Sequence, residues 1–198
     1  MNALVLRAGP WRGQLGLAAA GALLGAAGLV LDGASGLRAC HLACLLLGVA
    51  AAYALDEPGA EVIDACAVSR GRRTVVRVLA SATAVGLVSA AWSALGATGL
   101  LVLQLAGTSL VGAGLAALVR HWAPEPGELV SPVLLLTGLS VMLIGPFGDR
   151  VPLFPLGPAP ERTSWLWLAL SSVSLASIAC IGSWRSWVPR RPASPTSA

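Results

Sequence analysis

Long apolar stretches alternate with short polar segments along almost the whole chain of 198 residues. A helix needs about 20 predominantly apolar residues to cross the hydrocarbon core of a bilayer. Six stretches approach this length, at residues 15–31, 39–55, 75–94, 98–119, 130–147 and 164–184. Only Leu95-Gly96-Ala97 separates the third stretch from the fourth, which predicts a tight helical hairpin. The pattern therefore predicts an all-α, polytopic membrane protein with six transmembrane helices.

The polar segment between the second and third stretches carries the most charge. Residues 56–73 read DEPGAEVIDACAVSRGRR and hold four of the nine acids and three of the thirteen arginines. Asp56 can cap a helix with Pro58 in its first turn, and Glu57 and Glu61 would lie near the positive end of that helix. We therefore expect a short helix within this segment.

Four residues of this helix follow the spacing i, i+3, i+4 and i+7, so they share one face. These residues are Ile63, Cys66, Ala67 and Arg70, and Val62 borders them. Glu61 and Asp64 lie on another side, and the arginines at the end favour anionic lipid headgroups. The pattern predicts an amphipathic helix that lies along the membrane surface, with a solvated interfacial loop as the alternative.

The distribution of arginines predicts the orientation of the spans, since cytoplasmic loops carry an excess of positive charge. Ten arginines fall on one side of the six spans and three on the other. The three are Arg38, Arg150 and Arg162. We therefore expect a multi-pass protein of the plasma membrane with both termini, and the segment at 56–73, in the cytoplasm.

Composition supports the membrane class and excludes two functions. The chain is 56% hydrophobic and 11% charged, whereas a soluble domain carries about 25% charged residues. It contains no lysine, so it lacks the lysine of a Walker A motif and cannot bind ATP in that way. The net charge of +4 does not indicate nucleic-acid binding, because the arginines are spread over loops and form no basic stripe.

Few side chains within the stretches could carry chemistry. His41 and Arg77 lie near span ends, where long polar side chains reach the interface at little cost. Cys40 and Cys44 share a helix face beside His41, which suits packing, and a metal site there would need a ligand from elsewhere. Ser109 lacks the glycine expected directly after a nucleophile. We therefore expect neither catalysis nor a bound metal or cofactor.

The spans are rich in glycine, which predicts closely packed helices. Gly21, Gly25 and Gly28 lie on or near one face of the first span, and three more glycines crowd the fourth. Residues 1–187 then form a single transmembrane domain, and the tail at 188–198, rich in proline, serine and arginine, is expected to be disordered.

The residues around 53–77 resemble the permeases of ABC-2-type transporters. The shared features are a short span, an acidic turn, a glutamate eight residues before a Ser-Arg pair, a basic run and a long span. The residues that match are Glu61, Ser69, Arg70, Arg72 and Arg73. In outline, the six spans and the cytoplasmic termini also agree with this family.

The resemblance implies that a coupling helix at about 57–70 docks in a groove of a separate ATP-binding subunit. That subunit would bind ATP and Mg²⁺, so this chain would hold no cofactor and would not itself be an enzyme. The implied contact residues are Glu57, Glu61, Val62, Ile63, Cys66, Ser69 and Arg70.

The resemblance further implies a homodimer of permeases that exports its substrate. An apolar lining without buried charge favours a hydrophobic or amphipathic substrate, such as a lipid, a drug or a peptide natural product. Two alternatives remain at this point. The first alternative to a permease is a structural or regulatory subunit that transports nothing. The second is a membrane enzyme that acts on lipids.

Overall fold

The computed structural model describes residues 11–31, 33–56, 70–120, 122–123, 125–143, 153–155 and 161–184. These parts of the chain form α-helices and contain no strand, in agreement with the all-α prediction. The helices are α2 (Trp11–Val30), α3 (Gly33–Tyr53), α5 (Arg70–Ala94), α6 (Gly99–Val119), α7 (Pro126–Leu143) and α9 (Glu161–Trp184). The predicted disordered tail lies outside the described residues.

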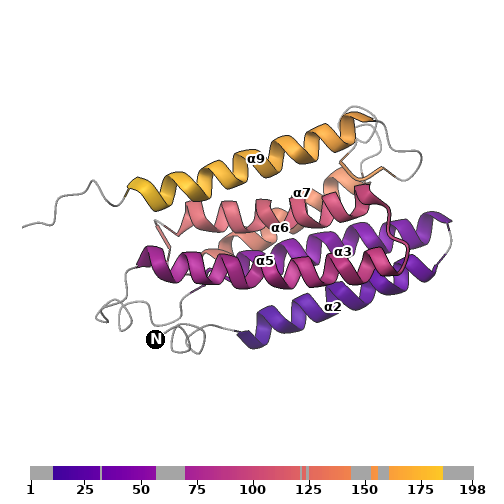
Figure 1. Cartoon of the computed structure of the whole chain (residues 1–198), viewed down its shortest axis with the longest axis horizontal. Helices are drawn as coiled ribbons and strands as arrows, with labels where there is room; N and C mark the ends of the chain where they lie inside the picture. Colours follow the sequence, from indigo (N-terminus) through magenta and orange to yellow (C-terminus); the bar gives the residue numbers. More distant parts are fainter. Residues whose placement is uncertain are drawn as a thin grey trace, which may run out of the picture.

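The helices lie side by side along the long axis of the molecule, with α2 at one side and α9 at the other (Figure 1). Helices α3 and α6 form the centre of the bundle, because α3 packs against α2, α6 and α7, and α6 also contacts α5, α7 and α9. More than half of the apolar part of α3 and of α6 is buried, against 11% of that of α5.

Five of these helices, α2, α3, α5, α6 and α7, are long and apolar enough to cross a membrane. They match the first five predicted stretches, although α3 begins at Gly33 rather than at residue 39 and α7 spans Pro126–Leu143 rather than 130–147. Helix α9 has 24 residues but is less apolar, since it is rich in serine. The helical membrane class is therefore supported, and the count of six spans stays a prediction.

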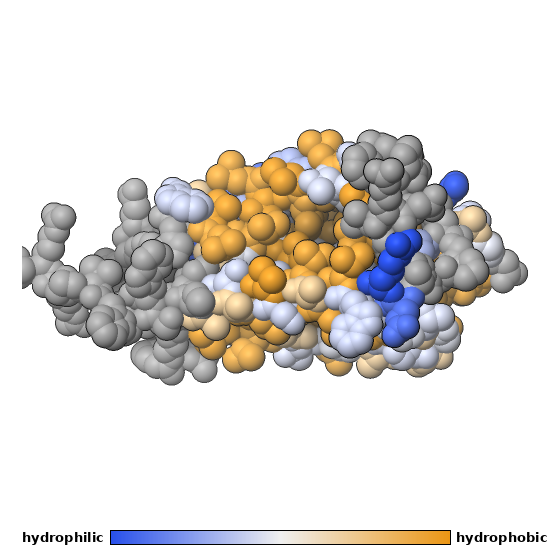
Figure 2. Space-filling model, turned by 90° about the horizontal axis from the view of Figure 1, so that it is seen from above, coloured by the Kyte–Doolittle hydropathy of each residue, from blue (hydrophilic) through white to orange (hydrophobic). Residues whose placement is uncertain are grey.

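Large apolar side chains cover the outside of the bundle. Figure 2 shows hydrophobic residues across the middle of one face and hydrophilic residues at its right-hand end. Soluble monomers rarely expose apolar patches of this extent, because contact with water is unfavourable. Six examples, each more than half exposed, are Leu23, Leu79, Leu87, Leu136, Leu143 and Val173. This surface suits lipid chains and indicates a membrane-embedded protein.

Glycines allow the helices to approach closely inside the bundle, as predicted. A Cβ atom on Gly112 of α6 would lie 2.1 Å from the carbonyl oxygen of Gly48 on α3. On α2, a Cβ atom on Gly25 would lie 1.7 Å from the indole ring of Trp92. The indole of Trp92 donates a hydrogen bond to the carbonyl of Ala22, at 3.3 Å. These contacts fix α6 against α3, and α5 against α2.

The predicted hairpin between the third and fourth stretches is present. Helix α5 ends at Ala94, and Gly96 has a φ of 92°, a conformation that side chains other than glycine rarely adopt. Thr98 then caps α6, with its hydroxyl oxygen accepting a hydrogen bond from the backbone N–H of Leu101 at 3.4 Å.

Candidate functional site

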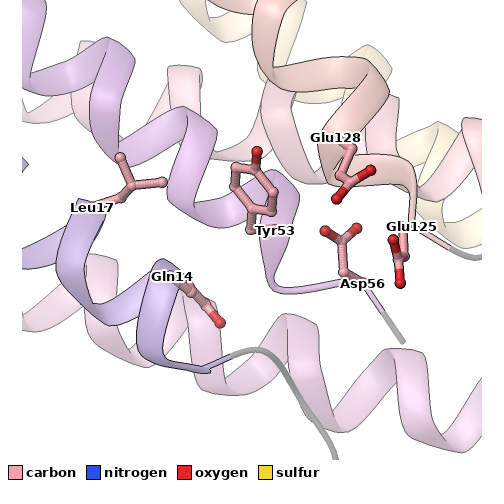
Figure 3. Close-up of a pocket in the computed structure, with 7 residues that line it drawn as sticks. Gln14, Leu17, Tyr53, Asp56, Glu125 and Glu128 are labelled. Atoms are coloured by element: carbon pink, nitrogen blue, oxygen red, sulfur yellow. The ribbon is translucent and has the colours of Figure 1, made fainter. Parts of the chain in front are cut away.

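A cavity of about 380 Å³ opens where α3 ends and α7 begins. Helix α2 forms one wall of this cavity, and the end of α3 and the start of α7 form the opposite wall (Figure 3). This is the end of the bundle that the arginine count predicts to be cytoplasmic. The residues labelled there are Gln14, Leu17, Tyr53, Asp56, Glu125 and Glu128.

Asp56 joins α3 to α7. Helix α3 ends at Tyr53, and a turn closed by a hydrogen bond from the N–H of Asp56 to the carbonyl of Tyr53, at 3.1 Å, follows it. The turn buries Asp56 to 3% exposure, and its Oδ1 accepts a hydrogen bond from the N–H of Gly127 at 2.6 Å. The first N–H groups of a helix lack partners within the helix, and the positive end of the helix dipole attracts a carboxylate. Asp56 therefore stabilises the start of α7.

This contact depends on the small size of Gly127. A Cβ atom at position 127 would lie 2.7 Å from Oδ2 of Asp56 and 2.8 Å from the Cα of Tyr53. Both distances are shorter than ordinary van der Waals contact, and the second involves backbone that cannot rotate away. Glycine thus lets the first turn of α7 lie directly against the end of α3.

Arg77 joins α5 to the same turn. Its guanidinium Nη1 donates a hydrogen bond to the backbone carbonyl of Asp56, and its side chain is only 1% exposed. The expectation that Arg77 reaches the aqueous interface was wrong in this respect, because its side chain is enclosed by protein. The carbonyl that accepts this bond follows the C-terminal end of α3, where a cation is favoured by the helix dipole.

The surroundings of Asp56 favour its neutral form. The pKa of this carboxyl is raised to about 6, mainly by burial and in addition by the negative charges of Glu125 and Glu128. The hydrogen bond from Gly127 and the charge of Arg77 act in the opposite direction and lower the pKa. Asp56 and Arg77 are both buried, so the expectation of an apolar lining without buried charge does not hold at this end of the bundle.

The predicted contact residues fall almost entirely outside the described part of the chain. Glu57, Glu61, Val62, Ile63, Cys66 and Ser69 lie there, whereas Arg70 is the first residue of α5. The structure instead describes what flanks this segment, namely Asp56 before it and α5 after it. Sequence reasoning missed Gln14, Glu125 and Glu128, although the Glu125-Pro-Gly-Glu128 run before an apolar stretch was a visible signal.

A second buried polar cluster lies near the opposite end of the bundle, close to the starts of α3, α6 and α9. His41 and Gln104 are 1% and 0% exposed, so His41 does not reach the interface as we expected. Gln104 Nε2 and the indole N–H of Trp167 both donate to the carbonyl of Leu153, at 2.8 and 2.9 Å. The ring of Phe154 lies 5.3 Å from that of His41 and 5.5 Å from that of Trp167, measured between centroids.

The candidate metal and nucleophile positions have ordinary packing roles. Cys40 Sγ donates to the carbonyl of Gly25 at 3.6 Å, and Cys44 is fully buried in the core between α2, α3 and α5. In the described residues, no three His, Cys, Asp or Glu side chains lie so that they could hold a metal ion. The hydroxyl of Ser109 donates to the carbonyl of Leu105 in its own helix, at 2.8 Å.

No family model, curated protein or solved structure matches this chain.

Proposed function

We propose that the chain is the membrane-spanning permease subunit of an ATP-binding-cassette transporter. The observation that carries this proposal is the network around Asp56, which joins three helices at the ends of the segment at 57–69. Asp56 directly precedes this segment, and Arg77 lies in the helix that directly follows it. Through Gly127 the same turn also contacts α7.

Through this network, the segment at 57–69 is attached at both ends to helices of the bundle, so that a movement of the segment would move these helices. A force on the segment pulls on the end of α3 and on the start of α5, which Arg77 connects to each other. Because the Asp56 carboxylate is bonded to α7, that helix shifts with them. A coupling element needs such rigid attachment, since a loop free at both ends would absorb the movement of its partner.

The partners of this permease are a cytoplasmic ATP-binding subunit and a second copy of the chain in the plasma membrane. The ATP-binding subunit supplies ATP and Mg²⁺, and the permease holds no cofactor of its own. Closure of the ATP-binding subunits moves the segment at 57–69, with Glu61 and Arg70 at the contact. The attached helices then rock and open a path for export of a hydrophobic or amphipathic substrate.

Purification from the native membrane tests this proposal. The tagged chain is extracted in mild detergent, and the proteins that accompany it are identified by mass spectrometry. We expect a stoichiometric soluble protein that carries a Walker A lysine, and we expect Glu61→Arg to lose it. Glu161→Arg makes the same charge change at the start of α9, at the other end of the bundle, and serves as the matched control.

Two outcomes would count against the proposal. A chain that arrives alone, or only with other membrane proteins, indicates a structural or regulatory subunit that transports nothing. Retention of the ATP-binding protein by Glu61→Arg, at the level of Glu161→Arg, removes the coupling role from the segment at 57–69.

A further inference from the structure

The cavity beside Asp56 has one acidic wall and one largely apolar wall. We propose that it binds a small organic cation with an ammonium or guanidinium head and an apolar body, and that this is the chemical class of the substrate. The binding site follows from the described residues alone, whereas its assignment to a substrate rests on the proposed function.

The acidic wall consists of three carboxylates from the end of α3 and the start of α7. The carboxylates of Asp56 and Glu128 point toward each other, and Glu125 lies beside them (Figure 3). Oδ1 of Asp56 accepts a hydrogen bond from the N–H of Gly127, while no described group donates a hydrogen bond to Oδ2. Neither glutamate forms an ion pair within the described part of the chain. This wall therefore offers negative charge and free acceptors to a ligand.

A second observation, independent of the acids, comes from the opposite wall. Gln14 on α2 is 9% exposed, and its side chain extends into the space between α2 and Asp56 (Figure 3). Its amide makes no hydrogen bond to any residue that the structure describes. Its carbonyl oxygen can accept a hydrogen bond from the N–H group of a bound cation.

The remaining lining suits the apolar body of such a cation. Leu17 projects from α2 toward the ring of Tyr53 (Figure 3). An aromatic face attracts a nearby cation through its quadrupole, and both side chains offer apolar surface. A ligand of this kind would thus contact charge on one side and apolar surface on the other.

The size of the cavity distinguishes an organic cation from a metal ion. A volume of about 380 Å³ falls in the range of roughly 300–1,000 Å³ that holds small molecules. Over the described ranges, the acids do not form a group of three that could hold a metal ion. A guanidinium or ammonium can instead bridge spaced carboxylates through several N–H donors.

The test measures binding directly and needs no partner subunit. The purified full-length chain is placed in lipid nanodiscs, and equilibrium dialysis at pH 7.5 measures binding of phenethylguanidinium. Phenethylurea, which has the same shape but no charge, is the matched ligand control. We expect one guanidinium bound per chain, and at least tenfold weaker binding of the urea.

Two variants test the site against one control. Asp56→Asn keeps an oxygen to accept the Gly127 hydrogen bond but removes the charge, and Glu128→Gln alters an exposed side chain. Each should weaken binding of the cation at least tenfold. Glu161→Gln, at the start of α9, should leave it unchanged. Circular dichroism confirms that each variant stays folded.

Three outcomes would overturn the inference. Equal binding of guanidinium and urea means that charge is not recognised, and unchanged binding by both variants places the ligand elsewhere. Absence of guanidinium binding to the native chain means that the cavity does not hold a cation of this class. Failure of the proposed function is seen separately, as loss of the ATP-binding partner, and would leave a cation site without its transport role.

Discussion

The two buried polar regions of this bundle lie near opposite ends and differ in what encloses them. Around Asp56, the polar groups face an open cavity of about 380 Å³. Around His41 and Gln104, the rings of Phe154 and Trp167 lie against the polar groups, and the carbonyl of Leu153 accepts two of the available donors.

Burial of a polar side chain therefore does not by itself mark a binding site. The cluster around Gln104 joins α6 and α9 to the backbone at Leu153, and it is closed by aromatic side chains. The Asp56 region joins helices as well, but it also leaves open volume beside its polar groups. Three predictions follow from this difference, ordered from the largest expected effect to the smallest.

Arg77→Met should produce the largest loss of stability, about 4 kcal/mol. The substitution removes the donor to the Asp56 carbonyl and leaves the buried carboxylate without its neighbouring cation. The loss can be followed by tryptophan fluorescence during thermal unfolding in detergent micelles. Arg38→Met, at an exposed position in α3, is the control and should change stability little. Equal melting of the two variants would show that the Asp56 network does not hold the bundle together.

The second largest effect should be a dependence of stability on pH that is caused by the Asp56 carboxyl. Because its pKa rises from 3.8 to about 6 on folding, the folded state binds the proton more tightly than the unfolded state. The stability gained by the protonated carboxyl is fully present below about pH 4 and is lost as pH rises through about 6. A shift of two pKa units corresponds to about 3 kcal/mol.

Asp56→Asn isolates this effect, because Glu125 and Glu128 still titrate in the variant. The difference in melting temperature between the native chain and Asp56→Asn should change between about pH 4 and about pH 7 and become constant above that. A difference that is the same at every pH would mean that the Asp56 carboxyl keeps its ordinary pKa in the fold.

Gln104→Met should have the smallest effect, a loss of about 1 kcal/mol or less. The substitution removes one hydrogen bond to Leu153, but it also removes Oε1, a buried acceptor without a partner in the described structure. Trp167→Phe, which removes the other donor to Leu153 and leaves that acceptor in place, is the comparison and should cost more. Thermal unfolding of the two variants in the same detergent measures the difference. A larger loss for Gln104→Met would show that Gln104 has a partner of its own.

The helices themselves were predictable from the sequence, because their signals are local. Apolar runs of membrane length predicted helices at five positions where the structure has long apolar helices, with ends displaced by a few residues. The hairpin at Gly96 was predictable because only three residues connect the third apolar stretch to the fourth. Close packing was predictable from the glycines, because a residue without a side chain allows two helix backbones to approach closely.

The candidate site was only partly predictable. The charge of residues 56–73 directed attention to the correct region, but the expected contacts of Asp56 were local. Its carboxylate instead binds Gly127, 71 residues later in the chain. His41 and Arg77 were expected at the interface because of their distance from the span ends. Which face of a helix meets a neighbour is set by the packing of the whole bundle, and no short pattern in the sequence encodes it.

The long apolar helices, their approximate ends and the concentration of charge at residues 56–73 can all be read from the sequence alone. Hydropathy and glycine content act on neighbouring residues, so they can be read along the chain. Only the tertiary structure decided that Asp56, Arg77 and Gly127 meet, and that a cavity remains beside them. That outcome depends on how α2, α3, α5 and α7 pack together, because the contacts join residues far apart in sequence.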